Sequence, residues 1–143
     1  MSTPLARFAQ SLSLPSQPIQ KAEEPAGITI PGLPKDLMGP TGRVFVHPGG
    51  DQVSTELTST FEIGGKYYNV PLLVPEQVGI ADLLAGKPPT QEQRDRAIRY
   101  MQQQPGFAGY SSEDEALAVI RARHQRIEQE LAPLISQYLR GHR

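Results

Sequence analysis

TELTSTFEIGGKYYNVPLLV, residues 55–74, is the stretch that decides the fold. Two runs rich in Thr, Tyr, Phe, Ile and Val flank Gly64-Gly65, which is the pattern of a β-hairpin with a two-residue turn. If Ile63 pairs with Lys66 across the turn, a mostly apolar set of side chains falls on one face of the ribbon. We expect this face to be buried, and it carries Leu57, Phe61, Ile63, Tyr68, Val70 and Leu72.

The opposite face of the hairpin is more polar. It carries Tyr67 opposite Glu62 and Asn69 opposite Thr60, so we expect it to meet water or a partner protein. Pro71, near the end of the second run, has no N–H to donate, which predicts that this strand lies at a sheet edge or stops pairing there. Tyr67 and Asn69 are therefore candidate protein-contact residues.

The composition limits the classes of protein to which the chain can belong. Its 143 residues include 14 prolines and 13 glycines, which predicts one modest domain with long irregular or extended segments. The absence of cysteine excludes disulfides and thiolate metal sites. A net charge of -1 gives no reason to expect general affinity for nucleic acid or an anionic membrane, and no apolar run is long enough to span a bilayer. Residues 1–18 lack the pattern of a secretory signal, so we expect a cytosolic protein or part of an assembly built in the cytosol.

Residues 1–42 contain seven of the 14 prolines, and we expect them to form an arm that is either disordered or extended. Signals for one short helix are also present at the start, with Thr3 as N-cap and Pro4 at the first helical position. We slightly favour the extended arm, because spaced apolar side chains suit docking along a groove of a partner. Its contact residues would be Leu5, Phe8, Leu12, Leu14, Ile19, Ile28, Ile30 and Leu33.

Residues 43–132 have the signals of a small α+β module. A short strand at residues 43–47 and the turn at residues 48–51 precede the hairpin, which predicts a three-stranded antiparallel meander. Thr90 and Ser112 each have a Gln or Glu three residues on, the spacing of a helix capping box. A further helical turn is expected around residues 80–84. The predicted architecture is the meander packed against the two capped helices.

The last helix has apolar positions at alternating spacings of three and four. Two interpretations stay open: an amphipathic helix packed on the sheet, which we favour, and self-association through this helix as a coiled coil. Pro133 should kink or end the helix near Leu131, leaving residues 133–143 as a C-terminal tail. The apolar positions are Leu117, Ile120, His124, Ile127, Leu131, Leu134 and Tyr138.

No motif in the sequence points to catalysis, so we expect a non-enzymatic protein without a cofactor or metal. The three histidines have no metal-ligand spacing. Arg121, Arg123 and Arg126 are the best candidates for nucleic-acid contact, but they are scattered around the helix and followed by glutamates, which argues against nucleic acid as a specific ligand. We assign Arg123, Arg126 and Tyr138 to candidate protein contacts. Phe107 and Tyr110 are interpreted as side chains that cap the core.

The order of elements from Arg43 to Ile127 resembles a small module that recurs in virion proteins of tailed bacteriophages, including large internal or ejected proteins. The features that carry this resemblance are the Gly-Gly-Lys-Tyr hairpin, the Val-Pro pair after it, the Gly-Phe loop and the start of the last helix. They stand at Gly64–Tyr67, Val70-Pro71, Gly106-Phe107 and Ser112–Ala116.

The resemblance implies a minor structural protein of a tailed phage particle, found in the virion after assembly in the host cytoplasm. Its partners would be other virion proteins of the tail, the neck or the internal components ejected with the DNA. Two alternatives are a small regulatory or inhibitory protein that binds a host factor, and an accessory module of a cell-wall-degrading enzyme.

Overall fold

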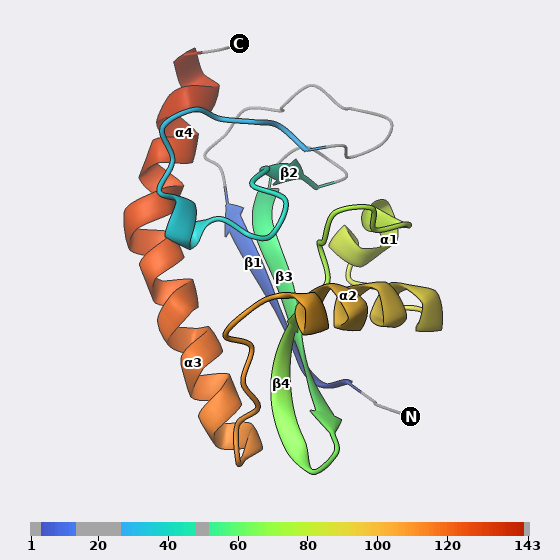
Figure 1. Ribbon diagram of the computed structural model, residues 1–143. Coiled ribbons are helices and arrows are strands. Elements are labelled where there is room, and N and C mark those ends of the chain that lie inside the picture. Colours follow the sequence, from blue (N-terminus) through green and yellow to red (C-terminus); the bar gives the residue numbers. More distant parts are fainter. Residues whose placement is uncertain (1–3, 14–26, 48–51, 142–143) are drawn as a thin grey trace.

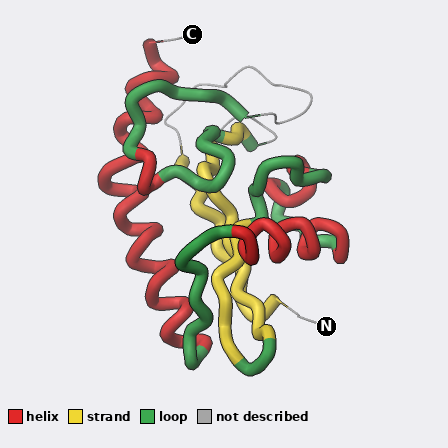
Figure 2. The backbone as a smooth tube through the Cα atoms, viewed as in Figure 1, coloured by secondary structure: helices red, strands yellow, loops and turns green. Residues whose placement is uncertain are grey.

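The computed structural model describes residues 4–13, 27–47 and 52–141, the first of these ranges by its backbone alone. An antiparallel sheet stands between two helical layers, one formed by the long C-terminal helix and the other by the two shorter helices (Figures 1 and 2). The fold therefore belongs to the predicted α+β class. The elements are β1 (Pro4–Ser13), η1 (Lys35–Leu37), β2 (Phe45–Val46), β3 (Gln52–Ile63), β4 (Lys66–Pro71), α1 (Ile80–Leu84), α2 (Gln91–Gln103), α3 (Glu113–Arg126), the π-helical η2 (Ile127–Leu131) and α4 (Ala132–Gly141).

The hairpin prediction is confirmed residue by residue. β3 and β4 pair from Ile63↔Lys66 to Thr58↔Pro71 in the expected register. The two turn glycines have φ values of 60° and 83°, a conformation that a two-residue hairpin turn needs and that glycine adopts without strain. β2 pairs antiparallel with the start of β3, as predicted, but on the same edge of β3 as β4, so the three strands do not follow the order of a simple meander.

β1 adds a strand that the sequence did not predict. It pairs antiparallel with β3 from Pro4↔Phe61 to Ser13↔Gln52, along the edge that β2 and β4 leave free. The short helix expected at the start of the chain is therefore wrong. An extended segment there satisfies the backbone groups of the second edge of β3, which a helix could not do.

An irregularity in the pairing of β3 changes which side chains share a face. Ala9 pairs with Leu57, but Ser11 pairs with Ser54, so β3 has one residue more than β1 between these pairs. Because side chains alternate along a strand, the extra residue reverses the alternation, and Ser54 falls on the same face as Leu57. The packing supports this assignment of faces, because Phe45, which pairs with Ser54, lies in the same core as Leu57.

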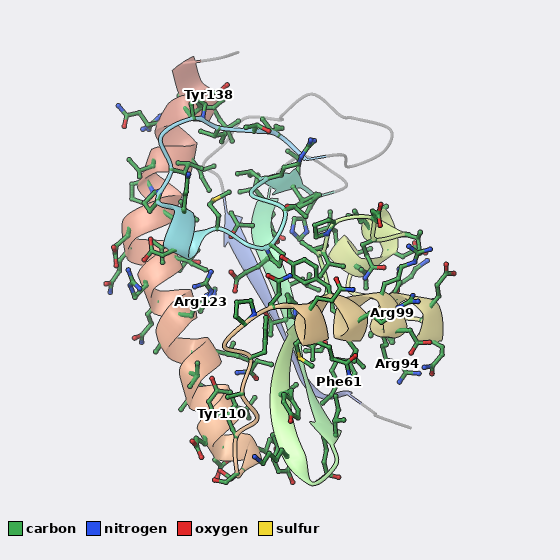
Figure 3. The ribbon with its side chains drawn as sticks, viewed as in Figure 1. Phe61, Arg94, Arg99, Tyr110, Arg123 and Tyr138 are labelled. Carbon is green, nitrogen blue, oxygen red and sulfur yellow. The ribbon has the colours of Figure 1, made fainter. Side chains whose placement is uncertain are left out.

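The first core lies between the sheet and the layer of α1 and α2. Phe61, on β3, is 0% exposed, and Figure 3 shows it beside the hairpin of β3 and β4. Four of the residues predicted from the hairpin, Leu57, Phe61, Val70 and Leu72, are buried in this core, whereas Ile63 and Tyr68 are partly buried and pack against it. The core comprises Phe45, Leu57, Phe61, Val70, Leu72, Leu73, Val74, Leu83, Leu84, Ala97 and Met101.

A second core fills the other face of the sheet, under the long C-terminal helix. The expectation that this face meets water is wrong for the part that α3 covers, where the Asn69 amide donates a hydrogen bond to the carbonyl oxygen of Ala116 at 3.0 Å. Glu62, near the hairpin turn, is exposed. Polar strand residues on this face, such as Thr60, are buried as well. The core itself comprises Ile30, Leu37, Val44, Val53, Ile127, Leu131 and Ile135.

Both chain ends contribute to this second core, which corrects two domain boundaries. Residues 27–42 are not a separate arm, since Ile30 and Leu37 are buried and the backbone of Ile28 pairs with that of Val44. Residues 133–141 are not a tail, since they are helical and Ile135 is 0% exposed. Each of these two segments adds apolar side chains to the second core, which the small sheet could not complete alone.

The helix passes through Pro133 by widening for one turn. In η2 the N–H of Ala132 bonds to the carbonyl oxygen of Ile127, five residues back, in place of the usual four. Proline lacks the N–H that an α-helical bond would use, and re-routing the bonds just before it lets the helix continue without a break. The predicted kink or end near Leu131 is thus replaced by a π-helical turn.

The apolar stripe of this helix faces the protein's own sheet. Ile120, Ile127 and Leu131 are buried in the structure, and the favoured interpretation of an amphipathic helix packed on the sheet is confirmed. Leu134, another position of the predicted stripe, is 39% exposed. Within the described residues, no helix combines the length and the apolar character that crossing a bilayer requires.

Candidate protein-binding groove

A groove of about 470 Å³ opens at the β4 edge of the sheet, between α3 and the segment that joins α2 to α3. Its floor consists of Glu56, Thr58, Asn69 and Pro71. Gly39 lies so close to β3 that a side chain at this position would collide with the carbonyl oxygen of Thr55. The walls are Met38, Gly39, Pro40, Tyr100, Gln104, Pro105, Gly106, Phe107, Ala108, Tyr110, Val119, Ile120 and Arg123.

An ion pair at the floor ties three segments of the chain together. Arg123 Nε lies 2.8 Å from each carboxylate oxygen of Glu56, and Arg123 Nη2 lies 2.6 Å from Oε1. The same guanidinium donates to the carbonyl oxygens of Asp36 at 2.8 Å and Met38 at 3.2 Å. Figure 3 shows Arg123 on the side of α3 that faces the sheet. Since Glu56 is only 7% exposed in its side chain, this bidentate arrangement is what makes a carboxylate tolerable on β3.

Two large apolar side chains of the groove are exposed to solvent. Phe107 is 42% exposed and Val119 is 44% exposed, and they are two of the four exposed large hydrophobic residues in the described part of the chain. Phe107 also borders a second hollow of about 210 Å³, lined by Ile63, Tyr68 and Met101 among others. Phe107 therefore lies at the margin of the first core, with more of its side chain exposed than the core-capping interpretation predicts. Exposed apolar side chains that converge on one groove are typical of a surface that binds a partner.

One end of the groove is bounded by a backbone contact between β4 and the segment before α3. The N–H of Tyr67 donates to the carbonyl oxygen of Tyr110 at 2.9 Å, and the N–H of Tyr110 donates to that of Tyr67 at 2.7 Å. The preceding segment, residues 105–108, does not pair with β4, and the groove occupies the space between them.

The phenol of Tyr67 is held in its neutral form by an acidic neighbour on the hairpin. A hydrogen bond to the Glu62 side chain and the negative charge of that carboxylate raise the pKa of Tyr67 above its ordinary value of 10.0, with a smaller contribution from Glu113. The raised pKa stabilises the folded protein below the ordinary value, and this contribution is lost as the pH rises through the pKa of the folded state.

Glu62→Gln is expected to lower the pKa of Tyr67 towards the ordinary value, because the amide carries no charge that opposes the phenolate. An NMR titration of the Tyr67 ring measures the change. Glu113→Gln is the control and should move the same titration by less, since Glu113 has the smallest effect. Equal shifts in the two variants would contradict the assignment.

Of the eight arm residues named from the sequence, six lie within the described residues, whereas Leu14 and Ile19 lie outside them. Leu5, Phe8 and Leu12 belong to β1, whose backbone pairs with β3. Ile28 bridges to the strand region before β2 and packs against the second core, and Ile30 is buried in that core. Ile28 and Ile30 are thus corrected from partner contacts to internal packing residues.

The other five candidates divide between the groove and other positions. Asn69 and Arg123 line the groove, and Tyr67 lies next to its end. Arg126 is outside it and pairs with exposed carboxylates, Asp36 at 3.1 Å and Glu130 at 3.0 Å, which raise the pKa of its guanidinium further. Tyr138 packs against the second core at the far end of α4 (Figure 3).

The sequence also failed to indicate several groove residues. Among them, Glu56 could have been recognised from the sequence, because an acidic residue inside a strand of threonines and apolar residues needs a basic partner when it is buried. Pro40, Tyr100 and Val119 carried no such signal, since their proximity depends on how the segments pack.

Among the described residues, a contact between a histidine and a serine is the arrangement that most resembles a catalytic pair. His47 Nε2 lies 2.6 Å from Ser54 Oγ, a distance at which a base could activate a serine. Ser54 is 0% exposed, however, and lines neither of the two hollows described above. We interpret the contact as one that satisfies a buried hydroxyl. In the described part of the chain, no three His, Asp or Glu side chains are grouped as metal ligands.

In comparisons with known proteins, no family model, curated protein or solved structure matches this chain significantly. The function therefore has to be argued from the groove and from the sequence.

Proposed function

We propose that the protein is a non-enzymatic, minor structural component of a tailed phage particle and that it binds another virion protein through the groove. The observation that carries the binding role is the convergence of Phe107 and Val119, both more than two fifths exposed, on one groove at a sheet edge. The virion setting rests on the resemblance of residues 43–127 to a module of phage virion proteins.

The polar groups of the groove support binding rather than catalysis. The charged residues Glu56 and Arg123 hold each other, and the Asn69 side chain is engaged by Thr60 Oγ1 at 2.9 Å and by the Ala116 carbonyl oxygen. A catalytic acid, base or nucleophile has to be available to a substrate, whereas these groups are occupied in holding the fold.

Mass spectrometry of purified particles from the phage that encodes the chain tests this proposal. We expect the protein at a fixed copy number relative to the major capsid protein, and we expect that number to survive further purification on a density gradient. A protein that is abundant in infected cells but missing from particles would overturn the proposal and favour a host-factor ligand.

A further inference from the structure

We infer that an extended segment of the partner protein adds to β4 as a new strand, inside the groove and next to Asn69. This inference rests on the proposed function and specifies its binding mode. It starts from the direction in which the backbone groups of β4 point.

The odd-numbered residues of β4 turn their backbone groups away from β3. Tyr67 shows this directly, because both its N–H and its carbonyl oxygen bond to Tyr110 outside the sheet. In an antiparallel pair such groups alternate, and Leu72 confirms the alternation by donating its N–H to the Leu57 carbonyl oxygen. Asn69 and Pro71 therefore present their backbone groups to the groove.

These outward groups lack a backbone partner within the described residues. Asn69 offers one N–H and one carbonyl oxygen, and Pro71 offers a carbonyl oxygen only. The pair between Tyr67 and Tyr110 is the first step of a ladder that the 105–108 segment does not continue. A partner strand can continue it, with one residue exchanging two bonds with Asn69 and a second residue donating to Pro71.

The groove also defines the chemistry of that strand. Its side chains would alternate between the α3 wall, with Val119 and Ile120, and the opposite wall, with Tyr100 and Phe107. No unpaired charge lines the groove, since Glu56 and Arg123 bond to each other. The segment that fits is therefore extended, uncharged and apolar on both sides, about three residues long, and without proline at the two residues that donate.

Peptide binding to the full chain tests this inference. The probe is a peptide selected from a random 12-residue display library on the purified protein, then synthesised and measured by calorimetry. Asn69→Pro removes the N–H and places a ring on the edge, so we expect at least a tenfold loss of affinity. Asn69→Ala is the matched comparison: it loses the same side-chain bonds but keeps the N–H, so Asn69→Pro should bind at least tenfold more weakly than Asn69→Ala.

Proline at this position is compatible with the fold, because the N–H of Asn69 does not pair with β3 and β4 already carries a proline two residues on. A second pair of variants does not depend on this substitution. Val119→Glu places a charge in the groove and should weaken binding at least tenfold, whereas Ala118→Glu, also exposed on α3, should not.

Several results would overturn the inference: no peptide selected, equal affinity of the Asn69→Pro and Asn69→Ala variants, or amide hydrogen exchange at Asn69 that the peptide does not slow. A dimer of the parent chain that Asn69→Pro dissociates would make a second copy the occupant. The two proposals fail separately. If the Asn69→Pro variant enters particles at the normal copy number, the strand addition is wrong while the virion role stands.

Discussion

Arg123→Met is expected to lower the free energy of unfolding by about 2–4 kcal/mol, because it leaves the carboxylate of Glu56 buried without its partner. The side chain of Glu56 is 7% exposed, whereas that of Arg123 is 34% exposed. The partial exposure of Arg123 admits screening water, which places the expected loss below that of a fully buried pair. Urea denaturation followed by far-ultraviolet circular dichroism measures the loss.

Two further variants distinguish the effect of an unpaired buried charge on stability from the effect of lost packing. Arg126→Met removes an arginine one turn along the same helix, where the ion pairs are exposed, and should cost much less than Arg123→Met. Glu56→Leu combined with Arg123→Met removes both charges and should recover most of the stability. A double variant as unstable as Arg123→Met would show that the unpaired carboxylate is not the cause.

Phe61→Ala is expected to cost about 3–5 kcal/mol, because it empties the centre of the first core. Phe61 is 0% exposed, pairs with Tyr68 on the neighbouring strand, and shares its core with buried residues of α1 and α2. The same denaturation experiment measures the change. The loss should appear in the denaturation midpoint with the slope unchanged, since the fold itself is kept.

Phe107→Ala is the matched control, because it removes the same side chain from a position that is 42% exposed. We expect a change in stability within about 1 kcal/mol, together with weaker binding of the groove peptide. A large loss of stability in this variant would mean that Phe107 holds the fold together and is not a contact residue for a partner.

The parts of the fold that could be predicted from the sequence are those fixed by nearby residues. The two-residue turn at Gly64-Gly65 sets every pair of the hairpin, and Thr90 with Gln93 forms the predicted capping box at the start of α2. In each case the interacting groups lie within a few residues along the chain, so the local pattern is enough to specify them.

The parts that could not be predicted depend on residues far apart in the chain. β1 pairs with a strand about 50 residues away, and Arg123 meets Glu56 across 67 positions. The sequence showed that Asn69 is polar but not that α3 would lie over it. Polar strand residues such as Thr60 therefore suggested an exposed face, whereas a helix with its own hydrogen-bonding groups covers them.

The groove was missed for a related reason. Its lining comes from residues 38–40, from β3 and β4, and from the helical segments after residue 100, none of which suggests a groove by itself. Of the residues proposed from the sequence, Asn69 and Arg123 line the groove, although both are held by contacts within the chain.

The π-helical turn η2 keeps the apolar side chains before and after it on the same side of the helix. Successive residues of an α-helix are about 100° apart around the axis, so each four-residue step overshoots a full turn by about 40°. From Ile127 through Leu131 to Ile135, an uninterrupted α-helix would rotate the last side chain about 80° away from the core. The wider turn absorbs this overshoot, and all three side chains are 0% exposed. Removing one residue from this turn would therefore make the helix more regular while turning the apolar side of α4 away from the sheet.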